Sequence, residues 1–214
     1  AAHILHTAKK SLAAFVGGVV HGYASNLVTR EPTQPDALMV MEADEFDQSF
    51  LKLHPDIAIV TTVDPDHLDV YKDEAALREA FRSFIARVRN PGQAIVHQKA
   101  LQQLFGQKNN AAHFTPYALE DAVIRAENVH IKDGDFYFDY VSEGITIQGL
   151  RLALPGYHLV ENALAVITAC LRLGVSPDHI RRGMASFQGV ERRCHYMLRG
   201  KRVVFLDDYA HHPT

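Results

Sequence analysis

The chain has few of the features that mark secreted, membrane or nucleic-acid-binding proteins. Only two of its 214 residues are cysteines, Cys170 and Cys194, which is too few for a disulfide-stapled scaffold. There is no signal peptide and no apolar run long enough to span a membrane, so we expect a cytoplasmic protein without membrane insertion. A net charge of -3 and a pI near 6.5 argue against nucleic acid as a partner of the whole chain, although a local basic patch stays open.

Two short apolar runs each end in a cluster of acidic side chains. Residues 37–41 run without a polar break into Glu42 and three further carboxylates, and residues 57–63 run into the stretch DPDHLD, which contains His67. Short uninterrupted apolar runs are typical of strands buried on both faces of a parallel sheet. Crowded carboxylates repel one another unless a cation or a hydrogen-bond donor offsets their charge.

We therefore expect the two runs to form neighbouring parallel strands whose carboxyl ends meet at one edge of the sheet. Glu42 and His67 could then share a hard cation such as Mg²⁺, which prefers carboxylate, phosphate and water oxygens and tolerates one imidazole. The alternative is that the acids cap turns and short helices after their strands, with His67 only hydrogen-bonded to Asp69.

Strands and helices alternate along most of the chain, which predicts an α/β fold with a doubly wound, mostly parallel sheet and flanking helices. Residues 122–154 differ, because apolar and polar residues alternate there around Asp133-Gly134, and this pattern predicts a small antiparallel β insert. Asp73 and Ser176 are placed to cap helices. We expect helices over 1–10, 73–90, 99–107, 156–174 and 176–187, strands within 11–20, 37–41, 57–63, 93–97, 112–118 and 203–206, a hairpin around Gly200 and a polar connection over 26–36.

Several polar residues stand where they could bind a ligand, and each has a simpler explanation. Asn162 lies early in an apolar helix, where its amide could read a base edge or merely occupy the first turn. Arg193 follows a helix and could meet a phosphate, although adjacent arginines are usually solvated. Asp208 and His211 follow the last apolar strand, where they could contact a nucleotide or substrate or could start a capped helix.

Five motifs in this order and spacing resemble the Mur ligases: EADEFDQSF, DPDHLD, PGYHLVENA, SFQGVERR and DDYAHHPT. The resemblance implies a three-domain, ATP-dependent ligase of peptidoglycan synthesis, in the branch that joins L-alanine to UDP-N-acetylmuramate through an acyl phosphate. Residues 1–193 would be the central ATP-binding domain without its phosphate-binding loop, and 194–214 would begin the C-terminal domain.

The resemblance also implies roles for single residues. Glu42 and His67 match magnesium ligands, and Asn162 and Arg193 match residues that contact ATP, with Arg193 also stabilising developing charge. Asp208 matches the acid that binds the ribose. The last motif adds two positions near the incoming amino acid, Tyr209 and His211.

Two features of the chain depart from the family pattern. The glycine-rich phosphate-binding loop is absent, and Leu159 stands where the family usually has a second asparagine. Three different functions also stay open at this point. A related ligase attaches a tripeptide to UDP-N-acetylmuramate in cell-wall recycling, but it tends to carry an insertion between the first two motifs. The chain could also be a non-catalytic folded module or a metal-dependent hydrolase centred on DHLD.

We predict that these 214 residues alone neither hydrolyse ATP nor form the amide, because the missing loop would supply the N–H groups and the lysine that neutralise the phosphates. The test is incubation with ATP, Mg²⁺, UDP-N-acetylmuramate and L-alanine, followed by assay of phosphate and product. Turnover comparable to that of an intact ligase would show that the interpretation is wrong.

Overall fold

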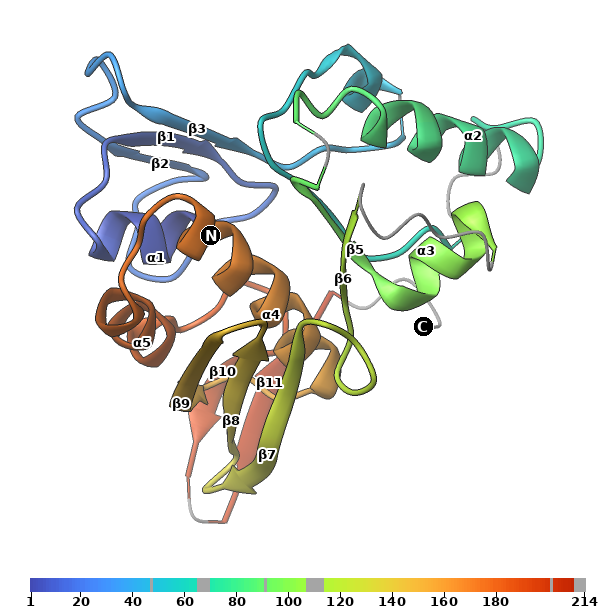
Figure 1. The fold of residues 1–214 in the computed structure, drawn as a ribbon. Helices are drawn as coiled ribbons and strands as arrows, with labels where there is room; N and C mark the ends of the chain where they lie inside the picture. Colours follow the sequence, from blue (N-terminus) through green and yellow to red (C-terminus); the bar gives the residue numbers. More distant parts are fainter. Residues whose placement is uncertain (47, 65–69, 91, 107–113, 201, 210–214) are drawn as a thin grey trace.

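The computed structural model describes residues 1–46, 48–64, 70–90, 92–106, 114–200 and 202–209. It contains three three-stranded sheets and a separate hairpin, with helix α4 (Tyr157–Arg172) at the centre (Figure 1). Two of the sheets contain parallel strand pairs and the third is antiparallel. The predicted α/β class with an antiparallel insert is confirmed.

The first sheet follows helix α1 (Ala2–Thr7), which begins without a side-chain cap. Strand β1 (Leu12–Phe15) lies between β2 (Leu27–Arg30), which is antiparallel to it, and β3 (Leu38–Met41), which is parallel. The expectation of only a polar connection over 26–36 was wrong. Val28 is buried between exposed neighbours, and this short alternation lets the segment pair with β1 despite its polar flanks.

The second sheet is parallel throughout, in the order β4 (Ala58–Val60), β5 (Ala94–His97) and β6 (Phe114–Tyr117). Short 3₁₀ helix η1 (Ser49–Lys52) precedes it, and helices α2 (Glu74–Ile85) and α3 (Gln98–Phe105) follow β4 and β5.

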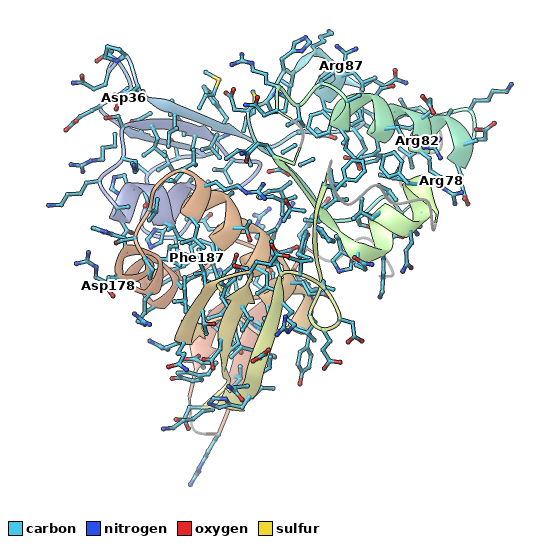
Figure 2. All side chains as sticks on the ribbon, in the orientation of Figure 1. Asp36, Arg78, Arg82, Arg87, Asp178 and Phe187 are labelled. Atoms are coloured by element: carbon cyan, nitrogen blue, oxygen red, sulfur yellow. The ribbon has the colours of Figure 1, made fainter. Side chains whose placement is uncertain are left out.

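The predicted cap of α2 is confirmed, since the Asp73 carboxylate accepts the Ala76 N–H at 2.8 Å. The helix ends at Ile85, several residues before the expected end at Pro91, because the chain turns there and the Arg89 N–H bonds the Pro55 carbonyl. Arg82 is on α2 (Figure 2), and its Nε donates to the Leu104 carbonyl of α3.

The predicted pairing of the two acid-ended strands was wrong. β3 pairs with β1 and β4 pairs with β5, so the two strands lie in different three-stranded sheets. An apolar run identifies a strand, but it does not say which of several similar runs becomes its partner. Both strands nevertheless pack against the same hydrophobic core, β3 through Leu38 and Val40 and β4 through Ile59.

The antiparallel insert consists of β7 (Arg125–Lys132), β8 (Asp135–Ser142) and β9 (Ile145–Leu152). Asp133 and Gly134 both have positive φ, which matches the twist of a tight hairpin and confirms the predicted turn. One face of this sheet packs against α4 through buried Phe138, Tyr140 and Leu150.

The remaining helices and the hairpin follow the sequence closely. The Ser176 hydroxyl accepts the His179 N–H at 3.4 Å at the start of α5 (Pro177–Ser186), so the predicted cap is confirmed. Strands β10 (His195–Arg199) and β11 (Val204–Asp207) form the expected hairpin, which pairs with no other described strand. No helix among the described residues is long and apolar enough to cross a membrane.

The close approach of α1 and α5 gives a stability prediction at Gly183. A Cβ atom there would lie 2.9 Å from Ile4 Cγ1 and 3.0 Å from the Ile4 Cα, which belongs to the backbone and cannot simply rotate away. Although alanine normally stabilises a helix interior by about 1 kcal/mol relative to glycine, we expect Gly183→Ala to lower the free energy of unfolding by about 1–3 kcal/mol. Urea titration measures this, with Ala185→Gly on the exposed side of α5 as a calibration of helix propensity. A stabilised Gly183→Ala variant would contradict the packing.

Candidate functional site

Glu42 follows β3 directly, and its carboxylate is held by the loop after β1. The Glu42 N–H donates to the Phe15 carbonyl, which continues the parallel ladder, and the Gly17 N–H donates to Glu42 Oε2 at 2.7 Å. A Cβ atom at Gly17 would lie 2.4 Å from that same oxygen. The glycine therefore allows the backbone to approach the carboxylate, and a donor offsets part of the charge that the sequence concentrates here.

The Glu42 side chain retains the capacity to bind a hard cation. It is exposed, and its Oε1 accepts no hydrogen bond from the described residues. Mg²⁺ usually binds through one or two protein carboxylates and completes its shell with phosphate and water oxygens, so this donor fits the ion. Within the described ranges, no group of three or more acidic, histidine or cysteine side chains could hold a metal by itself. His67 lies outside the described residues.

The loop after β1 also contacts the segment before the hairpin. The His21 N–H bonds the Gly189 carbonyl at 3.1 Å, the Glu191 N–H bonds the Val19 carbonyl at 2.9 Å, and Val20 and Val190 form an isolated β-bridge. These bonds bring the GVERR motif to the loop that holds Glu42. The Arg193 side chain is exposed and has no ion pair or hydrogen bond within the described part of the chain.

The acidic end of the hairpin is tied to the same segment. The Asp208 carboxylate accepts the Cys194 N–H at 3.1 Å, and the Tyr209 N–H donates to the Arg192 carbonyl at 2.7 Å. The Tyr209 side chain is 69% exposed. The structure thus gathers Arg193, Asp208 and Tyr209 near one another, whereas His211 lies outside the described residues.

Asn162 lies apart from this group, near the N-terminal end of α4. Its side chain is partly exposed, and it makes no hydrogen bond to Glu42 or Asp208. Leu159, one turn earlier, is partly buried and packs against the core. Asn162 therefore remains a separate candidate contact, on the helix end that faces the carboxyl ends of β5 and β6.

Glu161 is a polar residue at that helix end which sequence reasoning missed. Its Oε1 accepts hydrogen bonds from His97 Nε2 at 3.1 Å and from the Leu119 N–H at 3.2 Å. His97 ends β5, and Leu119 follows β6 closely. A lone glutamate in an apolar helix gives little signal of such a contact, although the position beside Asn162 in the PGYHLVENA motif could have drawn attention to it.

This fold, and the motifs at these positions, define a class of protein. The chain belongs to the Mur ligase middle domain family, whose model matches residues 24–170. It is 38% identical over 213 residues to the UDP-N-acetylmuramate–L-alanine ligase of Phocaeicola vulgatus, a match that covers 100% of this chain and 45% of the relative. The chain thus spans about half the length of the curated relatives that it matches.

Solved structures with this fold include two UDP-N-acetylmuramate ligases. The UDP-N-acetylmuramate-alanine ligase of Thermotoga maritima superposes with a TM-score of 0.82 at 24% identity, covering 99% of this chain and 47% of that one. The UDP-N-acetylmuramate:L-alanyl-gamma-D-glutamyl-meso-diaminopimelate ligase of Neisseria meningitides gives 0.71 at 24% identity, covering 89% and 62%.

The contact between the hairpin and its linker gives a prediction at Cys194. Partial burial, and then the charge of Asp208, raise the pKa of the Cys194 thiol. Asp208→Asn removes that charge, so the pKa should fall and the thiolate should be more abundant near pH 8. We expect faster alkylation by iodoacetamide, by less than about tenfold because the pair is largely solvated. Asp207→Asn is the matched control, and equal rates in the two variants would contradict the contact.

Proposed function

We propose that this chain is the nucleotide-binding part of a cytoplasmic, ATP-dependent ligase that joins L-alanine to UDP-N-acetylmuramate in peptidoglycan precursor synthesis. The observation that carries the proposal is a series of hydrogen bonds, to backbone and carboxylate oxygens, that connects Glu42, the loop after β1, residues 189–193 and the end of the hairpin. The curated relatives support the choice of amino acid, because those that match the whole chain are L-alanine ligases by name.

The boundary between two domains is proposed to lie between residues 193 and 194. The β10–β11 hairpin exposes apolar side chains that include Met197 at 56% and Phe205 at 59%. A two-stranded hairpin is marginal by itself, and exposed apolar side chains on it support a role as the start of a further packed domain. Residues 1–193 would then form the central ATP-binding domain, and 194–214 would begin the C-terminal one.

Glu42 and His67 would hold Mg²⁺ in this enzyme. The bound ion would neutralise phosphate charge while the γ-phosphoryl group passes from ATP to the muramyl carboxylate. The Gly17 N–H keeps the Glu42 carboxylate oriented before any ion arrives, so little side-chain freedom remains to be lost on binding.

The other motif residues would bind the nucleotide and the amino acid. Asn162 would contact the base, Asp208 the ribose, and Arg193 would stabilise charge that develops on the phosphoryl group. Tyr209 and His211 would lie beside L-alanine, whose amine then attacks the acyl phosphate to form the amide and release phosphate. Because the hairpin carries Asp208 and Tyr209 and the linker carries Arg193, nucleotide and amino acid would meet at the junction of the two domains.

The metal assignment predicts the effect of substitutions in the full-length protein. Glu42→Ala and His67→Ala should each lower ligase turnover by about 10²–10³ while the protein stays folded, since each removes a group that supports charge neutralisation. Glu143→Ala, at an exposed turn of the β insert, is the control. Near-normal turnover in either of the first two variants would overturn the assignment.

The approach of Gly17 to Glu42 gives an independent prediction. Gly17→Ala should displace the Glu42 carboxylate, because the new Cβ would overlap its oxygen. In the full-length protein we expect the Mg²⁺ concentration needed for half-maximal turnover to rise, with the melting temperature little changed. An unchanged Mg²⁺ requirement would mean that Gly17 does not position this ligand.

A further inference from the structure

Hydrogen bonds hold one oxygen of the Glu161 carboxylate in place, and the other oxygen has no such bond within the described part of the chain. Oε1 accepts from both His97 Nε2 and the Leu119 N–H. Oε2 accepts no hydrogen bond from the described residues and is not buried, since the side chain is 26% exposed. A carboxylate with one anchored and one open oxygen is arranged to accept a further hydrogen bond from a ligand.

His97 has a defined proton arrangement that supports this role. Its Nδ1 accepts the Lys99 N–H at 3.3 Å, where it caps α3, so Nδ1 carries no proton. The proton of the neutral ring is therefore on Nε2, which donates it to Glu161. His97 is 8% exposed, and its ring packs edge-on against Tyr117 at a centroid distance of 5.2 Å. The donor to Glu161 is thus rigidly held by two neighbouring strands.

The surroundings leave the charge of Glu161 without a cationic partner. Among the described residues no lysine or arginine forms an ion pair with it. Tyr117 is fully buried, and its hydroxyl group has no hydrogen-bond partner in the described part of the chain. Burial together with the charge of Glu161 raises the pKa of that hydroxyl. A partly buried carboxylate without a counter-ion gains from a donor that arrives with a ligand.

Glu161 precedes Asn162 directly, at the end of α4 that faces the carboxyl ends of β5 and β6. We propose that Glu161 is the residue that selects the base of the nucleotide, its Oε2 accepting a hydrogen bond from the exocyclic amine of adenine, with His97 as its positioning residue. This inference rests on the proposed function, which brings ATP to this helix end.

The chemistry of the base makes the inference specific. Adenine presents an amine at its six-position, whereas hypoxanthine and guanine present a carbonyl oxygen that a carboxylate repels. A site that hydrogen-bonds one group with a buried or fixed partner rejects the analogue that lacks it. In a glutamine at position 161 the amide oxygen would take the place of Oε1, because both groups that bond there are N–H donors. Its NH2 group would then lie where Oε2 lies and would donate to the carbonyl oxygen of hypoxanthine instead of accepting from the amine of adenine.

The test compares ATP with inosine triphosphate in the full-length protein. For the unchanged protein we expect kcat/KM with ATP to exceed that with inosine triphosphate by at least about tenfold, and Glu161→Gln should reduce this ratio about tenfold, mostly through KM. His97→Asn, which removes the positioning residue, should lower the same ratio of kcat/KM values by less than Glu161→Gln does. Glu143→Gln removes an exposed carboxylate far from this helix end and should leave the ratio unchanged.

The outcomes separate this inference from the proposed function. A parallel loss with both nucleotides in Glu161→Gln, at a constant ratio, would overturn the inference and show a merely structural role. Absence of ATP-dependent ligation in the unchanged protein would instead contradict the proposed function. In that case, competition of ATP and inosine triphosphate against trinitrophenyl-ATP still measures base selection, and equal competition by both would overturn the inference.

Discussion

The burial of helix α4 is the constraint on which the rest of the structure depends. Nearly every side of the helix is covered, with Val160, Leu164, Ile167 and Cys170 almost fully buried, and a helix that is apolar on all sides must lie inside a domain. The antiparallel insert packs against it, and the core that surrounds it reaches both sheets with parallel strands. The same burial fixes the direction of the helix, so its N-terminal end lies at the carboxyl ends of β5 and β6, where Glu161 bonds His97 and Leu119. The position of the N-terminal end of α4, the candidate site for the base, is therefore determined by packing and not by local polar residues.

The second organising contact is between backbone and carboxylate at Gly17 and Glu42. It relieves the charge that the EADE stretch concentrates at the end of β3, and it holds the loop whose next residues bond to 189–191. Because 192–194 in turn bond the end of the hairpin, a displacement at Glu42 could be transmitted to Asp208 and Tyr209 through a series of hydrogen bonds. This connection links the proposed metal ligand to the proposed domain junction.

The sequence allowed most elements to be predicted, since periodicity, caps and glycine turns are local signals. Asp73, Ser176 and Asp133-Gly134 act in the structure as their positions imply. Strand pairing was harder to predict from the sequence. β3 and β4 have similar apolar runs, and which strand each one pairs with depends on how the whole core packs. Strand β2 was not predicted because its two apolar residues, Leu27 and Val28, stand alone between polar residues, so that the segment resembled a connection. In the site, motifs identified Glu42, Asn162, Arg193, Asp208 and Tyr209 as candidates, but the Gly17 contact and the bonds of Glu161 arise from tertiary approach, which no spacing in the sequence encodes.

The central claim is that Glu42 and the N-terminal end of α4 belong to one metal-nucleotide site. Crystals of the full-length protein grown with Mn²⁺ and a non-hydrolysable ATP analogue would test it most directly, through the anomalous scattering of the metal. The account predicts an anomalous peak about 2.2 Å from a Glu42 oxygen, with the base of the analogue beside Glu161 and Asn162. A metal and nucleotide bound elsewhere, with Glu42 bonded only to the Gly17 N–H, would contradict it.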